Sequence, residues 1–495
     1  MLINNSILMK LAVINILFKH EFKVLSRNRV LVSLSTLIVF ILVSALWIGS
    51  SMLHKQEQTI TKIKNTDKEI TDSLKTRIKR VEANGRVYPG FIWDDPTFAY
   101  NTARNEGPKY AVKKPFALQA LNVGQSDVQP FYYKVYINKK QYLTFESEIE
   151  NSFLQFVGNF DFAFVVIYLF PLLIIVFSYN ILSAEKEQGT WVLLKTSNQS
   201  IAQLMICRIA IRYLLFTGFF WLIVTPVLTA FIGSSFLFTS NWHWLVAAVS
   251  MYFAFWFAVA LAVNSFSMTS NVNAMVLIFI WLFTGIIIPN LLQIGLNKVY
   301  PIPSRIDMLT AERDAINKYF EKDGQDLTKD VFSSPRAMIR QASIVTPGMV
   351  YGYGVIVYKS QEIKDQASAV AEGKLYAQIE KQQEAIRRFQ LFSPALMMQE
   401  ELSALSGSHW YQFNQFSKDV DAFRKKTQEF YYPKMATEAS YRTFTVADAM
   451  AIPQFKVKDY HDFSWINMKQ SFLIYLGVIC ILVFIGYRRL LEAKK

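Results

Sequence analysis

The chain has 495 residues, of which 52% are hydrophobic and 18% charged, and its formal net charge is +14. This composition is too apolar for a typical soluble domain and indicates contact with lipid. More than half of the positive excess falls in residues 1–53 and 467–495, where anionic lipid accounts for it. A nucleic-acid-binding protein needs a concentrated basic face, so we expect no nucleic-acid partner.

Long stretches without Asp, Glu, Lys or Arg locate the membrane-spanning segments. They are residues 30–53, 162–184, 213–297 and 470–487. A helix crosses the hydrocarbon core with about 20 apolar residues, and polar clusters at 233–244 and 264–273 divide the third stretch into three spans. The sequence therefore predicts a polytopic α-helical membrane protein with six transmembrane helices. TM1 is expected at 30–53, TM2 to TM5 within 159–296, and TM6 with a basic cytoplasmic tail within 467–495.

Basic residues flank these spans on one side of the predicted membrane. They are Lys19, Lys23, Arg27 and Arg29 before the first span, Lys186, Lys195, Arg208 and Arg212 between the second and third, and Arg488, Arg489, Lys494 and Lys495 after the last. Short cytoplasmic flanks carry such an excess of Lys and Arg. Both termini are therefore predicted to be cytoplasmic.

Residues 1–29 have the periodicity of an amphipathic helix. One face carries Leu11, Ile14, Phe18, Phe22 and Leu25, and the other carries Lys19, Lys23 and Arg27. This pattern predicts a helix in the cytoplasmic membrane interface. A signal peptide would have a shorter apolar segment close behind a short basic region, so we expect an uncleaved anchor.

Two large hydrophilic segments, 54–158 and 297–466, are predicted to lie outside the membrane as folded α+β segments. Residues 54–82 are expected to continue the helix of span one, and 131–145 to form strands with a turn near Asn138. Helices are expected at 360–390 and 409–430. The aromatic stripe of the second of these helices is interpreted as core packing; it comprises Trp410, Phe413, Phe416, Val420 and Phe423.

Motifs for catalysis or metal binding do not occur in the sequence. There is no G-x-x-x-x-G-K-[ST] loop, no H-E-x-x-H and no Cys pair at zinc-ligand spacing. We therefore expect this chain to bind no cofactor or metal itself. Asp161, Arg208 and Arg212 are placed at span boundaries, which leaves no charged groups at the membrane midplane for an ion-driven carrier. Pro171, Pro226 and Pro289 are each expected to kink a span.

Residues 183–197 are a polar segment between the second and third spans. We predict a cytoplasmic helix of about three turns, with the apolar flank "WVLL" (191–194) against the membrane. A short helix of this kind, held between two spans, is suited to transmit a displacement from a soluble partner.

Two stretches carry a resemblance to a known family. "GNFDFAFVVIYLFPLLIIVFSYNILSAEKEQGTWVLLKTSNQS" (158–200) resembles the ABC-2 type permeases of ABC transporters, whose segment has an E-[KR]-E-x-G-T core before a leucine run. "FSPALMMQEELSALSGS" (392–408) is similar to a segment of the large two-ectodomain branch of that family, related to the NosY-type permeases. The chain departs from the family at Trp191, where a leucine and then a proline-containing turn are more common.

The resemblance implies a permease that works with a cytoplasmic ABC ATPase dimer, which holds the ATP and Mg²⁺, and with a second permease subunit, identical or paralogous. The complex would lie in a bacterial cytoplasmic (inner) membrane, in contact with lipid, and export a substrate or transmit force to an extracytoplasmic partner protein. The residues implied at the ATPase-coupling contact are Glu185, Lys186, Glu187, Gly189, Thr190 and Leu194. Those implied in the interfacial helix are Phe18, Lys19, Phe22, Lys23 and Arg27.

Two other classes of function stay open on the sequence. A membrane-anchored scaffold or signalling protein would work through the outer segments and would have no ATPase partner. A membrane enzyme is disfavoured, because the outer segments offer no convergent nucleophile, base or metal set, although carboxylates such as Glu400 and Glu401 are present there.

Overall fold

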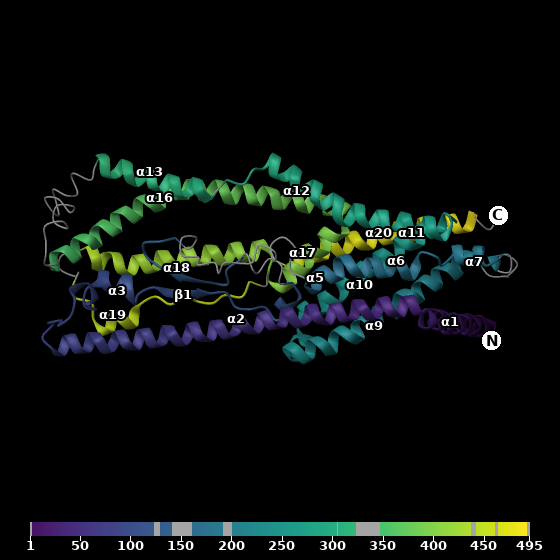
Figure 1. Ribbon diagram of the computed structural model, residues 1–495, viewed down its shortest axis with the longest axis horizontal. Coiled ribbons are helices and arrows are strands. Elements are labelled where there is room, and N and C mark those ends of the chain that lie inside the picture. The colour runs from purple at the N-terminus through teal and green to yellow at the C-terminus, as the bar shows by residue number, and fades with distance from the viewer. Residues whose placement is uncertain are drawn as a thin grey trace.

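The computed structural model describes residues 2–122, 129–140, 161–191, 200–303, 305–322, 347–436, 442–460 and 464–492. The protein is mostly helical and elongated, with a bundle of apolar helices at one end and a group of polar helices at the other (Figure 1). The helices nearest to both termini, α1 and α20, end on the same side of the molecule, at the end of the bundle that also carries α7 (Figure 1).

Six helices are long and apolar enough to cross a membrane, which is the number that the sequence predicted. They are α2 (Arg29–Ala83), α5 to α7 (Phe162–Glu187), α9 (Ile201–Ile232), α10 (Ser240–Ser265), α11 and α12 (Ser270–Val299), and α20 (Ser464–Glu492), whose apolar part is Met468–Glu492. The fourth, α10, lies at the centre of the bundle, packed against α6 (Phe170–Ser178), α9, α11 and α20. Its buried aromatic side chains, among them Tyr252, Phe253, Trp256 and Phe257, form much of the core.

The N-terminal helix α1 (Leu2–Arg27) is separated from α2 by one residue, Asn28. Asn28 has extended backbone geometry, and its Oδ1 accepts hydrogen bonds from the backbone N–H groups of Val30 and Leu31 at 3.1 and 3.2 Å. This is an N-cap, which ends one helix and starts the next. From there α2 runs for 55 residues, about 80 Å at 1.5 Å per residue, so residues 54–82 do continue the helix of span one.

Two of the three prolines predicted to kink a span follow a π-helical turn. Val165–Leu169 precedes Pro171, and Phe283–Ile287 precedes Pro289, whereas Pro226 lies inside α9. Proline has no N–H for the carbonyl four residues before it. The carbonyl of Ile167, four residues before Pro171, instead accepts from the Tyr252 hydroxyl at 2.8 Å.

The second π-helical turn is held by a short helix, α17 (Pro394–Ser406), that packs against α10 and α20. The N-cap residue of α17, Ser393, donates its hydroxyl to the Thr284 carbonyl at 2.6 Å. Tyr475 of α20 donates to the Pro394 carbonyl at 2.9 Å. In both π-helical turns a side chain from another element therefore satisfies a backbone carbonyl that would be costly to leave unpaired in an apolar core.

The polar end of the molecule, here called the distal region, contains the part of α2 beyond residue 53 and several shorter elements. These are η1 (Ile92–Asp94), α3 (Ala99–Asn105), β1 (Lys109–Val112), η2 (Gln119–Leu121), β2 (Tyr132–Val135), α13 (Arg305–Lys322), α16 (Pro347–Phe389), η7 (Gln390–Phe392), α18 (Trp410–Ala436) and α19 (Val446–Ala451). Helices dominate its described part, where the sheet is one antiparallel pair with Lys109 opposite Val135.

The prediction for 131–145 is confirmed for its first strand and for the turn near Asn138. β2 ends at Val135 before a turn at Ile137 and Asn138, and its partner is β1, which precedes it in the chain. The side chains of β2 explain this choice, because Tyr133 and Val135 pack with Ala111 of β1 and with Phe416 and Val420 of α18. Residues 141–145 lie outside the described ranges.

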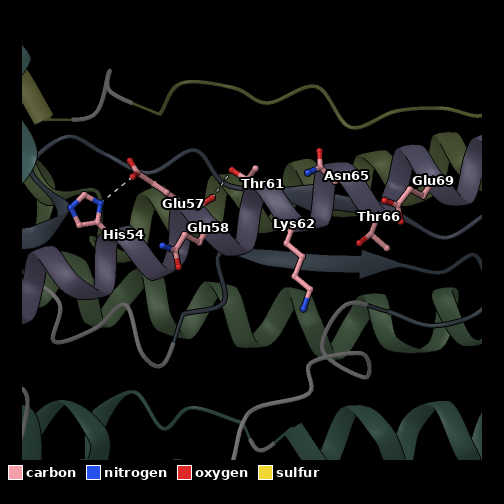
Figure 2. A pocket seen from close by; sticks show the side chains of 8 residues that line it. All are labelled: His54, Glu57, Gln58, Thr61, Lys62, Asn65, Thr66 and Glu69. Carbon is pink, nitrogen blue, oxygen red and sulfur yellow. Dashed lines mark hydrogen bonds and ion pairs between the residues drawn. The ribbon is translucent and has the colours of Figure 1, made fainter.

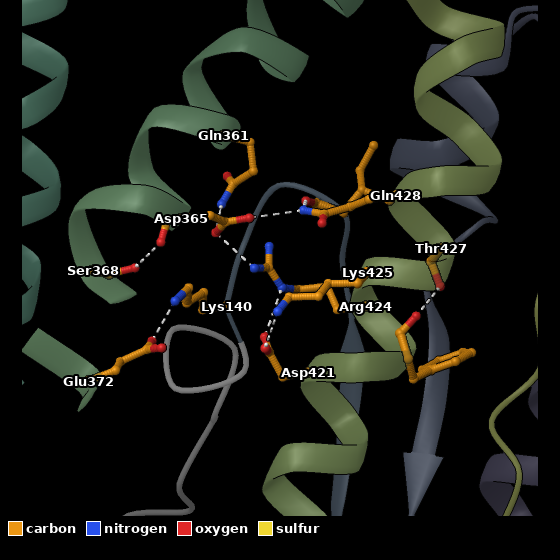
Figure 3. Close-up of polar contacts among 12 residues, drawn as sticks. Lys140, Gln361, Asp365, Ser368, Glu372, Asp421, Arg424, Lys425, Thr427 and Gln428 are labelled. Carbon is orange, nitrogen blue, oxygen red and sulfur yellow. Dashed lines mark hydrogen bonds and ion pairs between the residues drawn. The ribbon is translucent and has the colours of Figure 1, made fainter. Parts of the chain in front are cut away.

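The two helices predicted at 360–390 and 409–430 are confirmed as α16 and α18. The stripe of α18 is core in its C-terminal part, whereas Trp410 and Phe413 are half-buried. Phe416, Val420 and Phe423 are all buried. A buried arginine also joins the two helices (Figure 3). Arg424 of α18 donates from Nη2 to Asp365 of α16 at 2.8 Å, and Asp365 also accepts from Gln361 and Gln428.

Replacing Tyr252 by Phe removes the donor to the Ile167 carbonyl and leaves that buried acceptor unpaired. We expect a loss of about 1–3 kcal/mol of stability, seen as a lower Tm of the purified protein in detergent. Tyr213→Phe is the matched control, because the Tyr213 hydroxyl makes a longer bond of 3.3 Å to Ser250 in a half-buried site. Equal Tm values for the two variants would contradict this role of Tyr252.

Candidate functional site

The segment predicted as one helix over 183–197 is shorter in the structure. Helix α7 spans Ser183–Glu187, and Gly189 follows with φ +76°. This left-handed conformation favours glycine and commonly ends a helix, so the predicted three-turn helix is interrupted at Gln188 to Thr190. Leu194, one of the predicted coupling residues, lies outside the described residues.

Glu185 of α7 points towards the bundle and contacts the third span. Its Oε1 accepts from Nη1 of Arg208 at 2.8 Å. The hydroxyl of Thr190 donates to the Glu185 backbone carbonyl at 3.1 Å and also to its carboxylate. Two of the predicted coupling residues therefore contact each other, and one of them is bound to α9.

A second carboxylate, Glu21 of α1, lies between the two arginines of α9. Its Oε1 accepts from Nε of Arg208 at 2.5 Å, and its Oε2 accepts from Nε of Arg212 at 2.6 Å. The Glu21 side chain is 0% exposed. Arg212 also donates to the Phe177 carbonyl at the end of α6. We call Glu21, Glu185, Arg208 and Arg212 the Glu21 cluster; it joins α1, α6, α7 and α9.

The charges of this cluster keep Glu21 ionised in spite of its burial. Burial raises the pKa of Glu21, but the positive charges of Arg212 and Arg208 and their hydrogen bonds outweigh it, so the pKa lies below its ordinary value. A buried ion pair contributes little net stability compared with apolar packing, whereas removal of one partner costs about 3–5 kcal/mol. The main effect of the cluster is therefore to determine which helices pack together; its net contribution to the stability of the fold is small.

The sequence prediction for α1 identified its exposed faces and missed the face that binds the protein. Phe18 and Phe22 are 43% and 57% exposed, and Lys19, Lys23 and Arg27 are exposed as well. Glu21 is the only acidic residue among residues 1–53. This isolated carboxylate, together with two arginines four residues apart in α9, was the signal in the sequence that could have predicted their contact. Arg208 and Arg212, which were predicted at the inner mouth of span three, lie in the N-terminal part of α9 and are buried.

Glu187, the second carboxylate of α7, contacts the start of span five. Its Oε1 accepts from the backbone N–H of Ser270 at 2.8 Å, and its Oε2 accepts from the Ser270 hydroxyl at 2.9 Å. The hydroxyls of Ser183 and Ser270 are 2.8 Å apart. Glu187 therefore caps the N-terminus of α11, where a negative charge is favoured by the unpaired N–H groups and the helix dipole.

Two asparagines hold the turn between α6 and α7. Asn264 of α10 donates to the Ser178 carbonyl at 2.9 Å and accepts from the Leu182 N–H at 3.5 Å. Asn273 of α11 donates to the Tyr179 carbonyl at 3.2 Å. The end of α6 is thus fixed to spans four and five, and α7 follows it after a four-residue turn.

The remaining predicted coupling residues lie at the surface of this site. The Lys186 ammonium lies 4.9 Å from the centre of the Trp191 ring, a distance at which cations are attracted to aromatic faces. Gln188 and Gly189 are exposed. The surface that α7 offers to solvent therefore comprises Glu187, the turn after it and part of Lys186, while both glutamates also make hydrogen bonds within the chain.

A second polar surface lies on α2 just beyond span one (Figure 2). It is an open depression of about 650 Å³ lined by His54, Glu57, Gln58, Thr61, Lys62, Asn65, Thr66 and Glu69. His54 Nδ1 is 3.5 Å from Glu57 Oε2. All eight residues come from one face of one helix, so no second element among the described residues lines the depression with them.

The carboxylates considered for an enzyme, Glu400 and Glu401, face different partners. Glu400 is 2.7 Å from Nε2 of His409. Glu401 is 5% exposed and packs at the contact between α17 and α20, where Ser471 is its hydrogen-bonding neighbour. They do not converge on a common point, and within the described ranges no three His, Cys, Asp or Glu side chains gather as a metal site.

Residues 310–458 match DUF3526, a domain of unknown function. The match covers most of the second hydrophilic segment, with α16, α17, α18 and α19. It excludes α1, α7 and α9, so it does not bear on the Glu21 cluster. Searches of curated proteins and of solved structures returned no match.

Replacing Glu21 by Gln leaves two buried guanidinium groups with no compensating charge from α1. We expect about 3 kcal/mol of destabilisation, measured as a lower Tm. Lys23→Gln, on the exposed side of the same helix, is the control, with a change within about 0.5 kcal/mol. Because the folded pKa of Glu21 is lowered, the wild type also loses stability as the pH falls through it. A variant that kept this acid-dependent loss would contradict the assignment.

Burial raises the pKa of Glu401 to about 8, against a weaker opposing effect of Ser471. In the unfolded chain the carboxyl ionises near its ordinary value, so the folded state holds a proton that the unfolded state has lost. Stability should therefore fall as the pH rises towards 8, by at most about 1.4 kcal/mol per pH unit, and then level off. Tm values from pH 5 to 9 test this, and Glu401→Gln should flatten the profile; superimposable profiles would refute it.

Proposed function

We propose that this protein is the membrane subunit, or permease, of an ABC-2 type transport system driven by a separate cytoplasmic ATPase. The single observation that carries the proposal is the placement of the E-K-E-Q-G-T segment (185–190). Its short helix α7 is bound through Glu185 to the Glu21 cluster and through Glu187 to span five. A resemblance found in the sequence thus coincides with an element that is hydrogen-bonded to two helices of the bundle, α9 and α11, and is linked through Arg208 to a third, α1.

This arrangement supports a mechanical role for α7. A bound partner shifts a conformational equilibrium only if it interacts differently with the two states. A protein that binds the outer surface of α7 and displaces it would change the contacts of α1, α9 and α11 together, since each of these helices is hydrogen-bonded to α7 or its cluster. ATP binding and hydrolysis on a partner would supply that displacement.

The remaining parts of the chain fit this proposal without a cofactor of their own. ATP and Mg²⁺ belong to the ATPase dimer, and a second permease subunit, identical or paralogous, completes the complex. In a bacterial inner membrane, α7 and the termini would face the cytoplasm, where the basic residues of α1 contact lipid headgroups. The distal region would lie outside, and would export a substrate or pass force to an extracytoplasmic partner.

The test is affinity purification of the tagged protein from its native membranes in mild detergent, with mass spectrometry and an ATPase assay of the eluate. We expect a P-loop ATPase in stoichiometric amount. Lys186→Glu, which reverses a charge on the outer surface of α7, should lower its recovery at least fivefold. Lys62→Glu makes the same charge change on α2 in the distal region and should leave recovery unchanged.

The same purification decides against the proposal if the intact chain is recovered without any ATPase. That result would favour the scaffold hypothesis, in which the distal region works on its own. An unrelated polytopic membrane protein, tagged and purified in parallel, controls for ATPases that bind detergent micelles or resin.

A further inference from the structure

The two carboxylates of α7 make contacts of unequal strength. Glu185 contacts the guanidinium of Arg208, which is itself bound to the buried Glu21. Glu187 is exposed, and the contacts that the structure gives it are with an uncharged residue, through the N–H and hydroxyl of Ser270. Removal of Glu185 from Arg208 is costly, because Arg208 is buried and would lose one of its two counter-charges. An exposed carboxylate exchanges a neutral donor for water at much lower cost.

The chain connectivity places a pivot beside this weaker contact. Ser178 and Tyr179, at the end of α6, are held by Asn264 and Asn273. Leu182, whose N–H donates to Asn264 at 3.5 Å, is the last residue of this turn before α7. The Glu21 cluster binds α7 to α9, α1 and the end of α6. The contact of α7 with α11 is therefore the one that a small rotation of α7 after this turn would open, while α6 and α11 stay in place.

The element on the other side of the contact reaches the distal end of the bundle. Helix α11 begins at Ser270 and leads into the π-helical turn Phe283–Ile287. There Thr284 accepts the hydroxyl of Ser393, the N-cap of α17. A displacement at the start of span five therefore moves the helix that contacts α17. The continuation of this span, α12, contacts α16.

We infer that Glu187 is a positioning residue whose contact with Ser270 opens and closes during the ATP cycle, while the Glu185 contact with Arg208 stays closed. The inference rests on the proposed function, because it names which contact within the chain the ATPase changes. On this inference Glu187 acts through its contact with span five, whereas the resemblance implied a contact with the ATPase.

Ser183 and Ser270 allow a direct test, because their hydroxyls are 2.8 Å apart and cysteine is nearly isosteric with serine. The double variant Ser183→Cys/Ser270→Cys is made in a Cys207→Ala/Cys480→Ala background, which removes both native thiols. Disulfide formation with a mild oxidant is compared in the purified complex without nucleotide and after trapping with ATP and vanadate. The single variants Ser183→Cys and Ser270→Cys, oxidised in the same way, are the controls.

We expect rapid cross-linking without nucleotide and at least a fivefold lower yield in the trapped complex. Cross-linking before the assay should lower the ATPase rate of the complex at least fivefold, with the ATPase still bound and the rate restored by reductant. Equal cross-linking in both states, or full turnover of the cross-linked complex, would overturn the inference and leave the proposed function intact.

The variant Glu187→Gln distinguishes the positioning role of Glu187 from the proposed function of the whole protein. It should recover as much ATPase as the wild type, because Glu187 contacts α11, while the ATPase rate of the recovered complex should differ from that of the wild type. Loss of ATPase recovery from a monodisperse Glu187→Gln protein would show that Glu187 binds the partner and would refute the positioning role. Absence of ATPase from the wild type would instead refute the proposed function.

Discussion

The end of the bundle at α7 depends on one buried carboxylate shared by two arginines. Arg208 and Arg212 lie one turn apart inside an apolar helix, where their charges would be costly without a counter-charge. Glu21 supplies it from a helix that is nearly 190 residues away in the sequence. Because both oxygens are used, the carboxylate sets the position of α1 along α9, and Arg208 then sets the position of α7.

At the other end of the bundle, buried polar groups of the backbone also need partners. Prolines in spans two and five come after π-helical turns, and there carbonyl groups need donors from outside the helix. Tyr252 and Ser393 provide these donors at Ile167 and Thr284. Since Ser393 begins α17, the satisfaction of one carbonyl group in span five also places the short helix that joins the bundle to the distal region.

These two ends are connected by continuous helices rather than by flexible linkers. Helix α2 runs from the neighbourhood of α1 to the far end of the distal region (Figure 1). Span five connects α7 to α17 and α16. The ion pairs of the Glu21 cluster hold α1, α7 and α9 together, and a weaker exposed contact joins α7 to span five. A difference in contact strength of this kind lets one part of a packed bundle move while the rest stays fixed.

The sequence by itself determined the elements whose cause is local. The six spans follow from apolar runs, the extension of α2 and the helices α16 and α18 from 3.6-residue periodicity, and the core role of Phe416, Val420 and Phe423 from their shared face. Composition also located the polar segment at α7. Only the tertiary structure decided the partners: β1 for β2, Glu21 for Arg208 and Arg212, and Ser270 for Glu187. Such pairs join residues that are far apart in the chain. A local sequence pattern indicates that a buried charge needs a partner, but it does not specify which distant residue the folded chain places beside it.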